Sequence, residues 1–393
     1  MNDRAKIWKM RFAELRHAVF DYIKKLDKFL ILLAFICSIY GCILIDSAIY
    51  NQSGYSRTLP VQMAAVVVGM IAMIILSAID YGYYKFFWPA VSIVCLCLLI
   101  LTLIIGTGRE GADDSAWIRL GPVSIQPSEF VKLGFAITFS CHCAAMRDRI
   151  SSLPSVILLC AHAAIPLGLV VLQKDLGTAT VFLCLFITMM YVSGVKLRYF
   201  AAAGIAALVA IPVGWFFLLN DFHRARFLIA YTPEADPLGM GYQQYFGRMA
   251  IGSGQLKGLG LKNGIQSQSG FISESQNDYI FAVAGEELGF LGAGLILLLL
   301  TLLIIRIIII GFNAKNTQGR VLCLGIAAMF AFQTVINVGM CLCLLPVIGV
   351  TLPFFSAGGS SMLTCFAAIG LVESVRIYSQ PVKLQSGGTI IPK

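Results

Sequence analysis

The stretch Glu274-Ser-Gln-Asn-Asp278-Tyr-Ile-Phe-Ala-Val-Ala-Gly-Glu286-Glu287-Leu-Gly289 marks a boundary, where a long polar segment gives way to an apolar run that reaches residue 305. A charge at the centre of a bilayer costs about 2.5–3.5 kcal/mol, so carboxylates beside a membrane span usually have a function. Asp278, Glu286 and Glu287 all lie within about two to three helical turns. The stretch therefore indicates a membrane protein that handles protons or binds cations at this boundary.

The composition of the whole chain agrees with a membrane protein. Of its 393 residues, 58% are hydrophobic and only 12% are charged, about half the charged share of an ordinary soluble domain. Apolar runs near the roughly 20 residues that span a bilayer fall at 29–49, 60–79, 84–106, 127–146, 153–173, 177–194, 199–219, 280–305, 321–345 and 358–376. We therefore expect an all-α polytopic membrane protein with about ten transmembrane helices, forming a single membrane domain over residues 29–378.

One point of this count has an alternative. The fifth and sixth runs are separated only by Gln173-Lys-Asp-Leu-Gly177. If they form one broken helix, the chain has nine spans and its C-terminus lies outside the cell. The distribution of Lys and Arg favours ten, because most of the 29 basic residues then fall on the inner side in short segments, as the positive-inside rule requires.

The same distribution predicts where the remaining segments lie. Residues 1–28 are basic with interspersed apolar residues, and we expect an amphipathic helix on the inner leaflet or a solvated cytoplasmic anchor. Residues 379–393 form a cytoplasmic tail, so both termini are cytoplasmic. The large extracellular loop, 220–279, lies between helices 7 and 8. The net charge of +9 reflects this bias, and we expect no nucleic-acid partner.

The long loop is rich in glycine, but apolar residues such as Met249, Ile251 and Leu256 are interleaved with the glycines. A disordered linker would carry fewer apolar residues. We therefore expect a loop packed on the membrane surface, in which glycines allow the backbone to approach a ligand closely. A flexible cap is the alternative.

The predicted fourth span begins Gln126-Pro127-Ser128-Glu129-Phe-Val-Lys132. Proline suits the first helical position and an acid suits the first turn, so Glu129 could simply be a helix-start signal. Lys132 lies one turn deeper on the same face. Either the two side chains form a structural ion pair, or Lys132 presents its charge to an anionic ligand.

Two further polar positions have both a structural and a functional interpretation. Asp175 lies between the fifth and sixth runs, where it could cap the next helix or line a polar site. The last loop is apolar and leads through Gly358 and Gly359 to Ser360 at a helix start. Free backbone N–H groups there could hold a phosphate, and ordinary capping by Ser360 is the alternative.

Seven motifs occur in order over about residues 40–375. They are Asp46-Ser47-Ala48; Trp117-Ile-x-Leu-Gly with Gln126-Pro-Ser-Glu129-x-x-Lys132-Leu; Asp175-Leu-Gly-Thr-Ala; Asp236-Pro-Leu-Gly-x-Gly-Tyr-Gln243; Ile251-Gly-Ser-Gly254; Asn277-Asp278-Tyr-Ile-Phe-Ala with Gly285-Glu-Glu-Leu-Gly289; and Leu352-Pro-Phe-x-Ser-x-Gly-Gly-Ser-Ser361. Together they resemble the SEDS family of bacterial membrane proteins, which includes RodA, FtsW and SpoVE. The Thr351-Leu-Pro-Phe variant favours the RodA branch over the FtsW branch.

The resemblance implies a peptidoglycan glycosyltransferase of the bacterial cytoplasmic membrane that polymerises lipid II at the extracellular face. It also implies a class B penicillin-binding protein as the crosslinking partner, together with other proteins of the elongation or division complex. Asp278 matches the essential aspartate of the family, and Glu129, Lys132 and Asp175 match polar residues of its central cavity. The positions that match more loosely, on the outer side, are Arg57, Arg109 and Arg226.

These implications define a mechanism to test. The 4-hydroxyl of one lipid-linked unit would attack the anomeric carbon of another, with Asp278 as general base and undecaprenyl pyrophosphate as leaving group. Lys132 and the outer arginines would stabilise the pyrophosphate. A divalent cation, Mg²⁺ or Mn²⁺, held by Asp278, Glu129 and Asp175 is compatible with this reaction, although no sequence pattern identifies one. On an ideal helix from residue 278, Glu286 lies closer than Glu287 to the face of Asp278, so we include Glu286 among the binding residues.

Two other functions use the same features. A lipid II flippase would need polar access from both faces, whereas this chain concentrates its polar residues on one side. A noncatalytic scaffold of the cell-wall machinery would not need carboxylates beside its apolar spans. Both alternatives therefore fit the sequence less well than the enzyme.

Overall fold

The protein is a helical bundle in the computed structural model, which describes residues 20, 22–51, 55–108, 115–121, 123–218 and 221–379. Within these residues, eight helices are long and apolar enough to cross a membrane. They are α2 (Lys28–Ala48), α3 (Tyr55–Ala78), α4 (Tyr84–Ile105), α6 (Leu153–Leu172), α8 (Leu197–Val213), α13 (Gly289–Phe312), α14 (Thr317–Cys341) and α15 (Gly359–Ser379).

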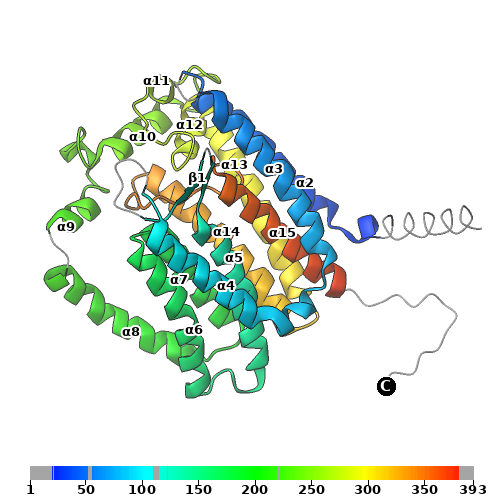
Figure 1. Ribbon diagram of the computed structural model, residues 1–393. Coiled ribbons are helices and arrows are strands. Elements are labelled where there is room, and N and C mark those ends of the chain that lie inside the picture. The colour runs from blue at the N-terminus through cyan, green and yellow to red at the C-terminus, as the bar shows by residue number, and fades with distance from the viewer. Residues whose placement is uncertain are drawn as a thin grey trace, which may run out of the picture.

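Two more helices coincide with predicted spans. The helix α7 (Leu176–Val192) is apolar but shorter, and α5 (Pro127–Ala145) carries the charged pair Glu129 and Lys132. Both pack against α14 inside the bundle (Figure 1). The prediction of an all-α polytopic membrane protein is confirmed, and the division between 172 and 176 supports two helices there. The count of ten spans and the domain boundaries stay predictions.

The helices are sorted by burial and polarity. α15 is the least apolar of the eight and has 83% of its central window buried, whereas α4 is among the most apolar and has 11% buried. Polar side chains are tolerated in a membrane span only where they face protein or a water-filled cavity. α14 and α15 therefore form the inner layer with α5, while α4 and α6 present apolar side chains outward.

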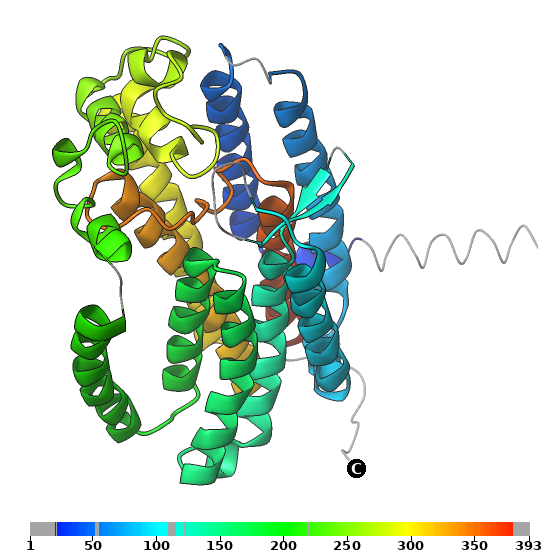
Figure 2. The same cartoon turned by 60° about the vertical axis from the view of Figure 1, so that its left-hand side comes forward.

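One apolar helix stands apart from the rest. α8 has no buried residue and continues into a π-helical turn, η3 (Gly214–Leu218). Figures 1 and 2 both show it at the edge of the bundle, next to the short helix α9 (Asp221–Leu228).

Short elements complete the structure. They are the 3-10 turns η1 (Tyr81–Tyr83), η2 (Arg147–Arg149) and η4 (Pro233–Ala235), the strands β1 (Ile118–Leu120) and β2 (Val123–Ile125), and the helices α10 (Tyr242–Ser253), α11 (Ile265–Gln268) and α12 (Ile280–Glu287). β1 and β2 pair antiparallel, with Ile118 opposite Ile125. α10, α11 and α12 gather at one end of the bundle, which we call the loop end (Figure 1).

The predicted span over 280–305 is wrong as a single helix. The structure divides it into α12 and α13 at Leu288, because Gly289 has a φ of +66°. A Cβ at Gly289 would lie 2.4 Å from the backbone nitrogen of Gly258, so the loop segment packs directly on this break. Every residue of α12 is buried. The segment that carries Asp278 is therefore enclosed by protein at the loop end.

Candidate active site

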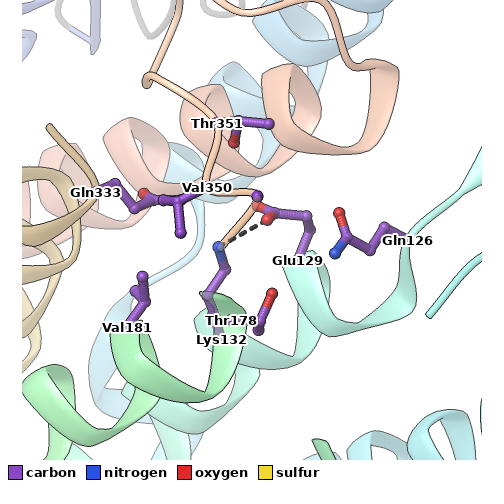
Figure 3. A pocket seen from close by; sticks show the side chains of 9 residues that line it. Gln126, Glu129, Lys132, Thr178, Val181, Gln333, Val350 and Thr351 are labelled. Atoms are coloured by element: carbon purple, nitrogen blue, oxygen red, sulfur yellow. Dashed lines mark hydrogen bonds and ion pairs between the residues drawn. The ribbon is translucent and has the colours of Figure 1, made fainter. Parts of the chain in front are cut away.

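A buried cavity lies where α5 and α7 begin, close to the end of α14 that faces the loop end. It offers about 10 Å³ to the centre of a water molecule, which is room for roughly one water. Its lining combines charged, carboxamide and hydroxyl side chains with one stretch of the loop before α15 (Figure 3). The lining residues are Gln126, Glu129, Lys132, Thr178, Val181, Gln333, Gly349, Val350 and Thr351.

The charged centre of this cavity is an ion pair on α5. Lys132 Nζ lies 2.7 Å from Glu129 Oε1, and Lys132 is only 1% exposed. The ion pair, one of the two alternatives that the i,i+3 spacing leaves open, is therefore present. A buried pair of this kind is costly to break, because the remaining charge is left without compensation. Lys132 has three N–H donors and Glu129 accepts one of them, so the ammonium can also bind an anion.

Asp175 connects two of the lining residues. It is the N-cap of α7, where its Oδ1 accepts the backbone N–H of Thr178 at 2.9 Å. Its Oδ2 accepts the Gln126 Nε2 at 2.9 Å. Burial raises the pKa of the Asp175 carboxyl, while the hydrogen bonds from Thr178 and Gln126 and the charge of Lys132 act in the opposite direction. The capping role is confirmed, and through its partners Asp175 fixes one side of the cavity.

Asp278 reaches the same cavity from the loop end. It precedes α12, is 4% exposed, and its Oδ2 lies 3.5 Å from the point that a Cβ on Gly349 would occupy. Gly349 itself lines the cavity and has a φ of +68°, which favours glycine. The absence of a side chain at position 349 therefore leaves the Asp278 carboxylate next to the cavity wall.

A residue that the sequence analysis missed fixes Asp278 in this position. The Nδ2 of Asn337, on α14, donates to the carbonyl oxygen of Asp278 at 2.8 Å and to that of Val350 at 2.7 Å. Asn337 is fully buried. Gln333 and Asn337 lie four residues apart within a predicted span, so they share one helix face. Two carboxamides on one face of an apolar run were the signal that could have identified them.

The two carboxylates that follow Asp278, Glu286 and Glu287, accept hydrogen bonds from other segments of the protein. Both are fully buried. Glu286 accepts the backbone N–H groups of Gln266 at 2.7 Å and Ser267 at 2.9 Å, and therefore holds α11. Glu287 accepts from the Ser47 hydroxyl and from Gln268 Nε2. Glu286 is not among the lining residues of the cavity; the helix begins at Ile280 rather than at residue 278, and its outer face is covered by the loop.

The remaining predicted residues are placed as follows. Ser360, in the first turn of α15, accepts the backbone N–H of Gln126 at 3.1 Å, which joins α15 to the start of α5. Arg57 is exposed near the start of α3, away from the cavity lining. Arg109 lies outside the described residues, as does the side chain of Arg226 on α9.

A protein-held metal does not fit this arrangement. Within the part of the chain that the structure describes, no group of three or more His, Cys, Asp or Glu side chains could hold a metal ion. Glu129 is paired with Lys132, and Asp175 caps α7. Asp278, Glu129 and Asp175 therefore do not form a cation site of their own.

These features define a class of protein: a polytopic membrane protein with a small, charged cavity beneath a structured loop. Its family is shown by comparison. The chain belongs to the FtsW/RodA/SpoVE family, described as "Cell cycle protein", whose profile matches residues 27–380.

Named relatives agree with this assignment. The chain is 33% identical to the peptidoglycan glycosyltransferase MrdB of Escherichia coli K12 over 354 residues, which are 90% of this chain and 94% of the relative. It is 36% identical to the stage V sporulation protein E of Bacillus subtilis 168 over 315 residues, which are 80% of this chain and 85% of that protein.

Solved structures share the fold. A chain from a structure titled "Structural coordination of polymerization and crosslinking by a peptidoglycan synthase complex" matches with a TM-score of 0.76 and 27% identity, covering 89% of this chain and 97% of that one. The rod shape determining protein RodA of Thermus thermophilus matches with a TM-score of 0.67 and 25% identity, covering 91% and 98%. The resemblance drawn from the seven motifs is therefore confirmed.

Proposed function

We propose that this protein is a peptidoglycan glycosyltransferase that polymerises lipid II into glycan strands at the extracellular face of the bacterial cytoplasmic membrane. Membership of the FtsW/RodA/SpoVE family and the name of the E. coli relative support the reaction class. The observation that carries the proposal for the site is that Gly349 and Val350 both line the cavity and lie beside Asp278. This arrangement brings the Asp278 carboxylate next to the cavity that holds Lys132.

The proposed reaction is a single displacement. The 4-hydroxyl of the acceptor GlcNAc attacks the anomeric carbon of the donor MurNAc, and Asp278 accepts the hydroxyl proton. The new glycosidic C–O bond forms as the bond to undecaprenyl pyrophosphate breaks, so the configuration at the anomeric carbon inverts. Asp278 is suited to this role because it is buried beside the cavity rather than solvated.

The leaving pyrophosphate requires positive charge. Lys132 supplies it from α5, and Glu129 orients the ammonium through the 2.7 Å contact. In a buried site a cation interacts more strongly with an anion than it does in water. Lys132 and Asp278 therefore serve opposite ends of the reacting bonds, one at the leaving group and one at the nucleophile.

The cavity is too small to enclose a lipid-linked disaccharide with its peptide. In this structure it has room for about one water molecule. We propose that the lipid tails lie between the membrane-spanning helices and the rest of the headgroup lies beneath the loop end.

We also propose a class B penicillin-binding protein as partner, with other proteins of the elongation or division complex. A similar chain occurs in a structure whose title couples polymerization with crosslinking. The strands that this protein makes would be crosslinked by such a transpeptidase.

Polymerisation of labelled lipid II by the purified protein tests the proposal. The reaction would be run with Mg²⁺ or Mn²⁺, and with and without a class B penicillin-binding protein. We expect glycan ladders from the wild type and none from Asp278→Asn. The matched control is Asp148→Asn, because Asp148 is exposed in η2, outside the cavity; it should polymerise normally.

Two outcomes would contradict the proposal. A normal ladder from Asp278→Asn would exclude Asp278 as general base. Failure of the wild type under every condition, with labelled lipid II crossing proteoliposome membranes, would establish a flippase instead.

A further inference from the structure

Gln333 differs from the other polar residues that line the cavity. It lies on α14 and is 2% exposed, and its Oε1 is buried without a hydrogen-bond partner among the described residues. The neighbouring polar groups are engaged: Lys132 with Glu129, Gln126 with Asp175, and Thr351 with Ser361. Among the described residues that line the cavity, Gln333 Oε1 is thus the buried side-chain atom without a hydrogen-bond partner.

Such a group is unfavourable for folding, because its oxygen has lost water and gained nothing in exchange. Buried polar atoms are normally satisfied, so an exception inside a binding cavity points to a ligand. Figure 3 shows Gln333 and Gln126 on opposite sides of the Glu129–Lys132 pair. A molecule bound at the pair would therefore meet the Gln333 carboxamide from the α14 side.

The chemistry of the oxygen restricts what that molecule presents. A carbonyl oxygen only accepts hydrogen bonds. An ionised pyrophosphate also only accepts, so it complements Lys132 and not Gln333 Oε1. The complementary groups on a lipid-linked amino sugar are its hydroxyls and its N-acetyl N–H.

We infer that Gln333 is a specificity-determining residue that binds the sugar of the lipid-linked substrate, its Oε1 accepting a hydrogen bond from a sugar hydroxyl or N-acetyl N–H while the pyrophosphate binds Lys132. This inference rests on the proposed function. The position of Gln333 suits the role, because Asn337, one turn further along α14, holds the backbone of Asp278. α14 thereby positions the sugar through Gln333 and Asp278 through Asn337.

The test compares Gln333→Met with Gln318→Met. Methionine has a similar length to glutamine and lacks the carboxamide. Gln318 is also buried on α14, but its Nε2 donates to the carbonyl oxygen of Tyr81 at 2.9 Å, so its role is structural. Both variants would be assayed for thermal unfolding and for kcat/KM in lipid II polymerisation, alongside the wild type.

We expect Gln333→Met to unfold at the same or a higher temperature, because the unsatisfied oxygen is removed, and to lose about tenfold or more in kcat/KM. Gln318→Met should unfold at a lower temperature and keep the turnover of each folded molecule. Inhibition by undecaprenyl pyrophosphate, which has no sugar, should be the same in Gln333→Met and the wild type.

Other results would overturn the inference. A lower unfolding temperature for Gln333→Met would make Gln333 a structural residue, and unchanged kcat/KM would remove it from substrate binding. Weaker inhibition by undecaprenyl pyrophosphate would place Gln333 on the pyrophosphate. If the wild type itself makes no glycan, the proposed function fails, which is a separate and recognisable result.

Discussion

Replacing Asn337 with leucine should weaken both the fold and the reaction. Leucine has nearly the same shape but no N–H, so the carbonyl oxygen of Val350 loses this donor and that of Asp278 keeps only the weak Cys341 thiol donor. An unsatisfied buried acceptor costs about 1–3 kcal/mol, so the loss of both bonds costs at most roughly 2–6 kcal/mol. The Oδ1 of Asn337, buried without a partner among the described residues, offsets part of this when it is removed. The net loss should be about 1–3 kcal/mol.

The expected readouts follow from that magnitude. Thermal unfolding in detergent should occur roughly 2–8 °C lower than in the wild type. Glycan polymerisation per folded molecule should also fall, because the same two bonds hold Asp278 to the cavity wall. The control is Thr334→Val on the same helix, whose hydroxyl donates only to the carbonyl oxygen of Phe330 within α14. It should change neither quantity by much.

The reasoning is refuted if Asn337→Leu unfolds at the wild-type temperature and polymerises at the wild-type rate. A loss of stability with full activity in the folded fraction would separate the two roles. Asn337 would then support the fold without positioning Asp278.

The other predictions concern the cavity and its supports. Lys132→Met should cost about 3–5 kcal/mol by leaving Glu129 buried and unpaired, and the double change with Glu129→Gln should regain most of that stability but not polymerisation; additive losses in thermal unfolding would contradict this. Because burial raises the pKa of Asp175 above its ordinary 3.8, the wild type should lose stability as pH rises from that value through the raised pKa. Asp175→Asn should lack that decline; if the unfolding temperatures of the two proteins change equally as the pH rises above 3.8, the prediction is wrong. Gly177→Ala would place a Cβ 2.2 Å from the carbonyl oxygen of Ile348 and should reduce polymerisation by displacing the cavity wall, whereas Gly168→Ala, with open space around its Cβ, should not; similar activity in the two variants would refute the steric argument.

Much of the fold could be predicted from the sequence because lipid imposes a simple rule. A helix that faces lipid must be apolar along its length, and α2, α4 and α6 follow their predicted spans closely. Local spacing also predicted that Glu129 and Lys132 share a helix face, since they lie three residues apart. The N-cap role of Asp175 was likewise visible from its place before an apolar run.

The rest depended on contacts between distant segments. The Asn337 side chain meets the Asp278 backbone across 59 positions in the chain, and no local pattern encodes that bond. The break at Gly289 and the covered face of α12 arise from the loop that packs on them. A helical projection from residue 278 therefore misplaced Glu286, which holds α11 instead.

The inverse relation between burial and apolar character has a consequence for how the protein enters the membrane. α4 and α13 are apolar enough to partition into lipid as single helices, whereas α15 is the least apolar of the eight candidate spans and packs along α3. α15 carries Glu373 and several hydroxyl groups, which are costly to expose to lipid. Its insertion is therefore more favourable when a helix already in the bilayer can cover these groups. The polar residues of α15 thus predict an order of assembly in which the outer, apolar helices enter the membrane first and α15 packs among them last.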